Sequence, residues 1–201
     1  NRLSVFASAA NTDRDSYYGP GNDPLKAYGK TTDLTAMGGA QYVHTFDKCF
    51  FMPSDLTAGL EYNRDRLKDN MWGYNRHTDQ TVNIYSAFLQ NEWKNDRWGI
   101  LIGGRLDKHN MVDNVIFSPR ANLRFNPTQN INLRLSYSSG FRAPQAFDED
   151  MHIENVGGTV AMIERAKNLK EEKSQSFSAS ADMYHRFGVF QTNFLIEGFY
   201  T

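Results

Sequence analysis

The sequence contains a single cysteine, no long apolar run and no excess of charge of one sign. One cysteine, Cys49, cannot form an internal disulfide or a cysteine-based metal cluster. The longest apolar stretches are fragments such as 49–52, far short of the ~20 residues that a membrane-spanning helix needs. Twenty-two basic and 23 acidic residues give a net charge of −1, so no cationic field attracts nucleic acid. These shortages argue against a helical membrane protein and against a nucleic-acid partner.

Aromatic residues are abundant by contrast. Three Trp, 10 Tyr and 14 Phe accompany 15 Gly, a combination too apolar for a disordered chain and favourable to strands. The mean hydropathy is nevertheless low, at −0.61. The chain opens directly on an alternating pattern at 1–5, with no initiating Met and no signal peptide. We therefore expect a piece of a longer β protein, whose location a missing targeting segment does not reveal.

Polar and apolar residues alternate with a period of two along most of the chain. At 131–138 the apolar residues Ile131, Leu133, Leu135 and Tyr137 alternate with Asn132, Arg134, Ser136 and Ser138. The pattern predicts nine strands, at about 1–10, 33–46, 54–66, 78–94, 97–109, 114–126, 130–141, 172–187 and 189–201. The stretch 78–94 has apolar residues on both parities, which allows a bulge there. No helical period competes with this alternation.

The connections between these strands are of two kinds that follow one another in turn. Short turns alternate with mostly longer loops, which include 11–32, 67–77 and 142–171. In an up-and-down meander one rim then carries the turns and the other the loops, as in outer-membrane β-barrels. Trp93 and Trp98 flank one turn while Tyr62 and Tyr137 lie toward the opposite strand ends, which suits two aromatic girdles. A soluble sandwich or barrel with core aromatics remains the alternative, because soluble antiparallel sheets alternate too.

Several motifs occur in a specific order. They are 89–94 (Leu-Gln-Asn-Glu-Trp-Lys), 103–107 (Gly-Gly-Arg-Leu-Asp), 117–128 (Phe-Ser-Pro-Arg-Ala-Asn-Leu-Arg-Phe-Asn-Pro-Thr), 133–144 (Leu-Arg-Leu-Ser-Tyr-Ser-Ser-Gly-Phe-Arg-Ala-Pro) and 168–174 (Asn-Leu-Lys-Glu-Glu-Lys-Ser). The series resembles the barrel of TonB-dependent outer-membrane receptors, well over 54–201 and by strand and loop pattern alone over 1–53. One departure is Glu171, where the family usually has Pro, and it bears on the local turn.

The resemblance implies an all-β fold in which 1–201 forms an antiparallel meander of about nine long strands, part of a larger transmembrane β-barrel. Nine strands are too few to close the 22-stranded barrel of this class. The plug domain, the TonB box and the remaining strands have no counterpart in the chain. The implied function is import of a scarce nutrient across the bacterial outer membrane, with TonB, outer-membrane lipid and a ferric chelate, haem or cobalamin as partners. No cofactor and no enzymatic activity are implied.

The motif Phe141-Arg142-Ala143-Pro144 marks the point where a strand leaves the sheet toward the loops. Pro144 donates no ladder hydrogen bond and biases Ala143 toward an extended conformation, so we expect regular pairing to end there. Arg142 is suited to hold a carboxylate of the lumen or plug, or a ligand.

The loop that follows supplies the other candidate ligand-binding residues. Asp148, Glu149, Asp150 and Glu154 offer carboxylate oxygens to a hard cation, although their spacing does not match a 12-residue calcium loop and a solvated acidic loop fits as well. His152 lies in the interval where haem-uptake members of the family have a His, and imidazole is an axial iron ligand. In those members the flanking motif usually begins Asn-Pro, whereas this chain has Ala166-Lys167 there. A solvent-exposed or hydrogen-bonded His is the alternative.

Two other functional classes compete with the transporter. A soluble lipocalin-like barrel predicts apolar side chains inside, around a ligand. An outer-membrane barrel enzyme predicts a nucleophile, a base and an acid gathered from neighbouring strands, but no Gly-x-Ser-x-Gly, His-Glu-x-x-His or phosphate-binding Gly motif is present.

Overall fold

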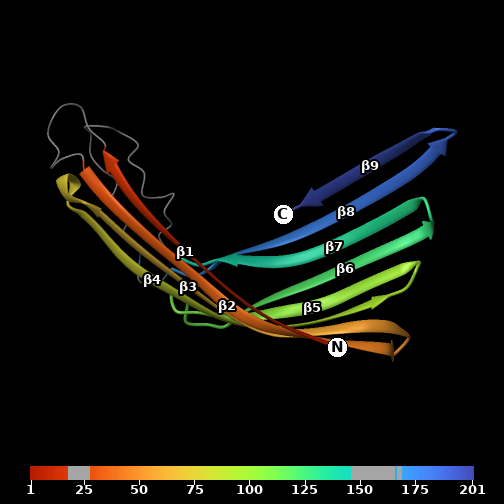
Figure 1. Ribbon diagram of the computed structural model, residues 1–201, viewed down its shortest axis with the longest axis horizontal. Coiled ribbons are helices and arrows are strands. Elements are labelled where there is room, and N and C mark those ends of the chain that lie inside the picture. The colour runs from red at the N-terminus through yellow and green to blue at the C-terminus, as the bar shows by residue number, and fades with distance from the viewer. Residues whose placement is uncertain (18–27, 146–165, 167–168) are drawn as a thin grey trace.

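The computed structural model describes residues 1–17, 28–145, 166 and 169–201. They form one antiparallel sheet in which each strand pairs with the next along the chain (Figure 1). The strands are β1 (Arg2–Tyr17), β2 (Tyr28–Cys49), β3 (Met52–Met71), β4 (Arg76–Lys94), β5 (Trp98–His109), β6 (Ile116–Thr128), β7 (Ile131–Arg142), β8 (Glu172–Phe187) and β9 (Phe190–Tyr200). The predicted all-β meander of nine strands is confirmed.

Helical structure is nearly absent from the described part of the chain. It is limited there to η1 (Trp72–Tyr74), a single 3₁₀ turn closed by Asn75 in the left-handed region at φ 50°. No helix among these residues has the length and apolar character needed to cross a membrane.

The register extends the alternation of each strand across the sheet. Ser136 of β7 lies opposite Asn122 of β6 and Ser178 of β8, whereas its neighbour Leu135 lies opposite Leu123 of β6. Directly opposed residues of paired strands point to the same side, so polar residues collect on one side and apolar residues on the other. We call the side of Ser136 the polar face and the side of Leu135 the apolar face.

The distribution of burial is the reverse of that in a water-soluble protein. The buried side chains of Ser86, Asp107 and His109 lie on the polar face. On the apolar face, Leu60 is 66% exposed and Ile102 is 56% exposed. Charged groups are rarely buried and large exposed apolar patches mark contact surfaces, so the sheet is built for an apolar environment on one side only.

Aromatic side chains lie at both ends of the apolar face. Near the short turns, Trp98 stacks on Phe125 with ring centroids 4.2 Å apart. Toward the loop ends, Tyr62 contacts Tyr85 at 4.9 Å. Along β4, the stretch from Tyr85 to Trp93 spans ~26 Å at about 3.3 Å per residue, close to the height of the apolar band of outer-membrane barrels. The aromatic residues therefore border a band of membrane dimensions.

The first three strands extend further toward the loops than the alternation predicts. The stretches 11–17, 28–32 and 67–71 were expected in loops, yet β1, β2 and β3 continue through them without a register shift. The residues pointing outward there are polar, such as Asp13 of β1 and Lys68 of β3. The inward side of the β3 extension carries the buried Leu67 and Met71 beside Asp69. The outward hydrophobic pattern therefore ends where the apolar band ends, although pairing continues.

The bulge allowed within 78–94 is not found. The register of β4 is uninterrupted against both β3 and β5. Irregularities occur instead at the short turns, between Phe46 and Cys49 and between Phe125 and Thr128. The prediction was wrong because apolar residues enter the polar face of β4, where Phe88 lies over Gly59 of β3; a Cβ added at Gly59 would come within 2.3 Å of the ring.

Candidate functional site

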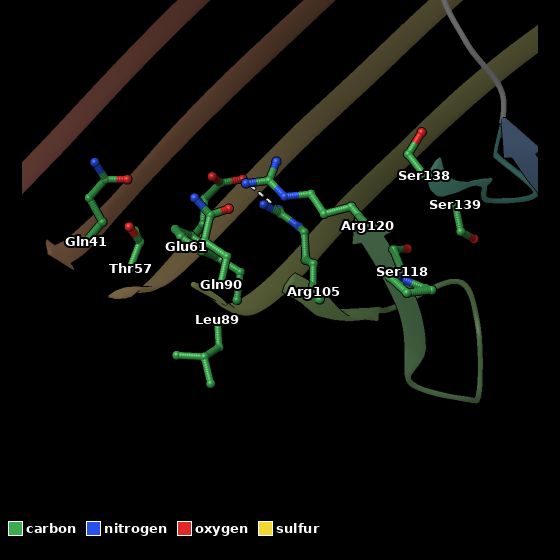
Figure 2. A pocket seen from close by; sticks show the side chains of 13 residues that line it. Gln41, Thr57, Glu61, Leu89, Gln90, Arg105, Ser118, Arg120, Ser138 and Ser139 are labelled. Carbon is green, nitrogen blue, oxygen red and sulfur yellow. Dashed lines mark hydrogen bonds and ion pairs between the residues drawn. The ribbon is translucent and has the colours of Figure 1, made fainter. Parts of the chain in front are cut away.

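A pocket of about 480 Å³ lies on the polar face and is bounded by strands β2 to β7. Its polar lining residues are Gln41, Thr57, Glu61, Gln90, Arg105, Ser118, Arg120, Ser138 and Ser139. In Figure 2, Leu89 points away from these side chains, as expected for the apolar face. Amides and hydroxyls both donate and accept hydrogen bonds, whereas the guanidinium groups of Arg105 and Arg120 only donate, so the pocket offers donors to a ligand or protein segment that carries oxygen atoms.

Arg105 is the centre of a hydrogen-bonded network beside this pocket. Its Nη2 donates to Glu61 Oε1 at 2.8 Å and to Ser86 Oγ at 2.8 Å, and its Nε donates to Asp107 Oδ1 at 2.8 Å. Ser86 Oγ in turn donates to Asp107 Oδ1 at 2.6 Å. The network fixes one guanidinium against two carboxylates on strands that are not neighbours.

The register explains how these groups meet. Glu61, Ser86 and Asp107 form one cross-strand row over β3, β4 and β5, and Arg105 is two residues before Asp107 on the same face of β5. Its side chain reaches diagonally across β4 to Glu61 (Figure 2). Asp107 is 4% exposed and Glu61 17%, so charge-assisted bonds replace much of the water these carboxylates lose.

A second ionic cluster lies toward the loop ends of β2, β3 and β4. Asp69 Oδ2 accepts from Arg76 Nε at 3.0 Å and forms an ion pair with Arg76 Nη2 at 3.0 Å, and Asp69 Oδ1 accepts from Thr31 Oγ1 at 2.7 Å. The side chains of Asp69 and Arg76 are only 1% and 4% exposed. A pair removed this far from water persists only when its hydrogen bonds are complete, so this cluster fixes three strand ends in one arrangement.

The Phe-Arg-Ala-Pro motif is anchored through a buried histidine. His109 has no exposed surface; its Nδ1 accepts from the Met111 backbone N–H at 3.0 Å, and its Nε2 lies 3.1 Å from Gln145 Oε1. Because Nδ1 accepts, Nε2 carries the hydrogen and donates it to Gln145. Ala143 packs with Val112 and Ile116 in a small apolar cluster. The motif is thereby attached to the connection between β5 and β6.

The structure places some of the predicted site residues. Phe141 and Arg142 end β7, and the β7–β8 pairing ends with Arg142 opposite Glu172, in agreement with the expected end of regular pairing. Ala143 is buried and Pro144 follows it outside the sheet. A ligand role for Arg142 stays a prediction.

The remaining predicted ligand residues, His152, Asp148, Glu149 and Asp150, lie outside the described residues, as does Glu154. Within the described ranges, no group of His, Cys, Asp and Glu side chains has the arrangement of a metal site. Glu171 directly precedes β8, and its carboxylate lies 3.0 Å from Lys173 Nζ. A hydrogen bond from its own backbone N–H, followed by that to Lys173, lowers the pKa of Glu171.

Sequence reasoning did not single out Glu61, Arg105 or Asp107. Arg105 and Asp107 belong to a motif noticed for its resemblance, and their spacing of two on a polar parity was a usable signal. Glu61 could not be identified as their partner, because the pattern of one strand does not give the register that places residues of β3 and β5 in the same cross-strand row.

Comparison with known proteins identifies the family to which this chain belongs. The chain matches the family described as TonB dependent receptor-like, beta-barrel, over residues 2–201. It therefore belongs to the TonB-dependent receptor family, and the match includes the N-terminal part, where only strand and loop pattern was evident. No curated protein sequence matches the chain.

Siderophore receptors are among the solved structures that the chain resembles. The siderophore receptor PirA from Pseudomonas aeruginosa is 13% identical with a TM-score of 0.64, over 96% of this chain and 38% of the receptor. PirA from Acinetobacter baumannii is 18% identical with a TM-score of 0.63, over 96% of this chain and 31% of the receptor. The ferric enterobactin receptor PfeA from Pseudomonas aeruginosa is 19% identical with a TM-score of 0.65, over 91% of this chain and 30% of the receptor. The chain thus spans about a third of their length, and at these identities the likeness concerns the fold.

Proposed function

We propose that the chain is a sector of an outer-membrane receptor that imports a ferric siderophore with energy supplied through TonB. The observation that carries the proposal is the reversed burial of the sheet, whose polar face buries charged networks while its apolar face exposes a band bordered by aromatic residues. An outer-membrane barrel needs both faces, because lipid surrounds it and its lumen holds water, protein and ligand.

In the closed barrel the polar face lines the lumen. The pocket around Arg105 then lies on the path between the loop rim and the turn rim, and its donors face passing ligand oxygens or the plug. Arg142, at the loop end of β7, makes the first contact with ligand, together with the acidic segment and His152 that follow it in the sequence.

A ferric siderophore is preferred to haem or cobalamin because of the related structures. PirA is described as a siderophore receptor and PfeA as a ferric enterobactin receptor. Haem would need an axial ligand, for which His152 is the candidate. An unaltered Soret band in haemin titrated with the His152→Ala receptor would remove His152 as that ligand.

The two rival classes have less support. A lipocalin-like barrel would bury apolar side chains inside and expose polar ones, the opposite of the arrangement of Leu60 and Asp107. An enzyme has no support from the family, whose members are receptors.

The test uses the intact receptor in its own outer membrane. A strain lacking the gene is grown with ferric enterobactin, a ferric hydroxamate, haemin or cobalamin as the sole supply of iron or cobalamin, and uptake is followed with radiolabelled iron. We expect loss of growth and uptake with a ferric siderophore, restored by the gene only when TonB is present. Normal uptake in the deletion strain, or uptake restored without TonB, would overturn the proposal.

A further inference from the structure

The outward side of β3 changes from apolar to basic where the exposed apolar band ends. Leu60 and Tyr62 belong to that band and to its aromatic border. The next three outward positions toward the loops are Arg64, Arg66 and Lys68. The inward positions between them are acidic or apolar, so the basic character belongs to the outward side alone.

The register extends this pattern to the neighbouring strands. Lys108 of β5 lies in the cross-strand row of Tyr62 and Tyr85, which forms the aromatic border. The next two rows toward the loops contain Arg64 and Arg66, and their partners on β1, β2 and β4 are uncharged. Over β1 to β5 the first three rows at the border therefore carry cations and no carboxylate.

The level of these cations matches the headgroup layer of a membrane. A bilayer adds ~5–8 Å of headgroups on each side of its hydrocarbon core. At about 3.3 Å per residue and a strand tilt of ~40°, Arg64 lies ~5 Å and Arg66 ~10 Å beyond Tyr62. The first outward carboxylates, those of Asp13 and Asp79, follow in the next row, ~15 Å beyond Tyr62. The cations thus lie in this layer or at its edge, and the carboxylates lie outside it.

Two of these cations have no acidic partner within the described part of the chain. Arg64 is exposed and forms no hydrogen bond or ion pair there. Lys108 is also exposed, and its Nζ donates to the backbone carbonyls of Val112 at 3.0 Å and Asp113 at 2.7 Å, which are neutral acceptors. Both side chains therefore retain an uncompensated positive charge.

The third cation, Arg66, is only partly neutralised. Its Nη2 lies 3.6 Å from Asp79 Oδ2, an oxygen that Lys68 Nζ also approaches at 3.5 Å. Two cations therefore share one carboxylate, and Arg66 Nε is shielded from water with no acceptor among the described residues. We call Arg64, Arg66 and Lys108 the basic border. Its donors remain available to an anion from outside the chain.

We propose that the basic border binds the phosphate groups of a lipid in the leaflet on the loop side, while the acyl chains of that lipid lie on the exposed apolar band. Basic groups next to a membrane surface attract anionic lipids, and guanidinium groups pair with phosphate oxygens through two parallel hydrogen bonds. The inference rests on the outer-membrane placement of the proposed function. It adds a lipid partner on the outward side of the sheet, separate from the lumen and its ligand.

The experiment measures lipid binding to the intact receptor in detergent micelles. Diphosphoryl lipid A, a glycolipid with two phosphates, is titrated and the bound lipid is measured by native mass spectrometry, with phosphatidylcholine as the reference of zero net charge. We expect lipid A to bind at least about 10-fold more tightly, because each basic group near an anionic surface contributes about 5-fold.

Substitution of the two arginines tests the site directly. The double variant Arg64→Gln with Arg66→Gln should bind lipid A about 10-fold more weakly, and the double variant with Lys at both positions should retain most of the affinity. Lys68→Gln is the matched control on the same side of β3. It removes a cation ~15 Å beyond Tyr62, more than a Debye length from the border, and should change binding by less than about 2-fold.

Four results would overturn the lipid site. They are equal binding of the two lipids by the wild type, unchanged binding of lipid A by the double Gln receptor, an equal loss in Lys68→Gln, and displacement of lipid A by inorganic phosphate, which would indicate a site for the free ion. If the double Gln receptor does not fold, the double Lys receptor decides. Its binding of lipid A should weaken at high salt, and binding insensitive to salt would contradict the proposal.

Uptake of ferric siderophore by the same receptors separates the two proposals. A wild-type receptor that binds lipid A but transports no siderophore would refute import and leave the lipid site intact. Normal uptake by a receptor without preference for lipid A would refute the lipid site and leave import intact.

Discussion

The two faces of the sheet share one backbone but suit opposite environments, one polar and one apolar. The polar face buries charges and pairs them, as in the contacts of Arg105 and Arg76. The apolar face leaves Leu60, Leu89 and Ile102 more than half exposed and holds no charge within its band. Because residues alternate strictly along each strand, the two environments are only one residue apart. A substitution's cost should therefore depend on parity more than on position along the strand.

The largest effect is expected where a charge pair is most completely buried. Arg76→Met would leave Asp69 without its guanidinium, and removing one partner of a buried pair costs about 3–5 kcal/mol. Urea unfolding of the intact receptor in lipid bilayers measures the loss. The double variant Asp69→Leu with Arg76→Met should recover much of it, because no buried charge remains. Equal stability of the single variant and wild type would mean that water reaches Asp69.

The next prediction compares adjacent residues of β4 that differ in face. Leu89→Arg places a charge within the apolar band and should cost about 2–4 kcal/mol if the site lies near the membrane midplane. Gln90→Arg places the same side chain on the polar face, in the central pocket, and should cost less than about 0.5 kcal/mol as an ordinary polar-surface change. The same bilayer unfolding assay compares them. Similar costs for the two variants would contradict the assignment of the faces.

The sequence alone predicts the strands and the face on which each residue lies, but not the contacts between side chains of different strands. Alternation located all nine strands and their faces, because a period of two is a local property of each strand. It missed the extensions of β1 to β3 beyond the apolar band, where the outward parity carries polar residues such as Asp13 and Lys68. It also missed the ionic contacts: Asp69 and Arg76 lay in an expected loop, and the reach of Arg105 across β4 to Glu61 depends on the register of three strands.

A smaller effect is expected at the half-exposed Arg105 network. Arg105→Met removes three donors from Glu61, Ser86 and Asp107, and hydrogen bonds to charged groups contribute about 1.5–3 kcal/mol. We expect a loss in the lower part of this range, because the guanidinium is 34% exposed and water can replace it in part. Arg105→Lys should recover only a fraction, since an ammonium group cannot match the planar fork that spans β4. Full recovery by Lys would mean that charge, rather than geometry, holds the network.

The smallest effect is expected for an ion pair outside the apolar band. Asp79 of β4 lies 3.6 Å from Arg66 and 3.5 Å from Lys68 of β3, and all three side chains are more than 40% exposed. Exposed pairs contribute about 0–1 kcal/mol and are screened by salt, so Asp79→Asn should change the unfolding free energy by at most about 0.5 kcal/mol. Repeating the measurement at high salt should remove even that difference, whereas the effect of Arg76→Met should persist. If Asp79→Asn were as costly as Arg76→Met, the outward side of β3 and β4 near Asp79 would be shielded from water. The apolar band would then extend beyond Tyr62 toward the loops.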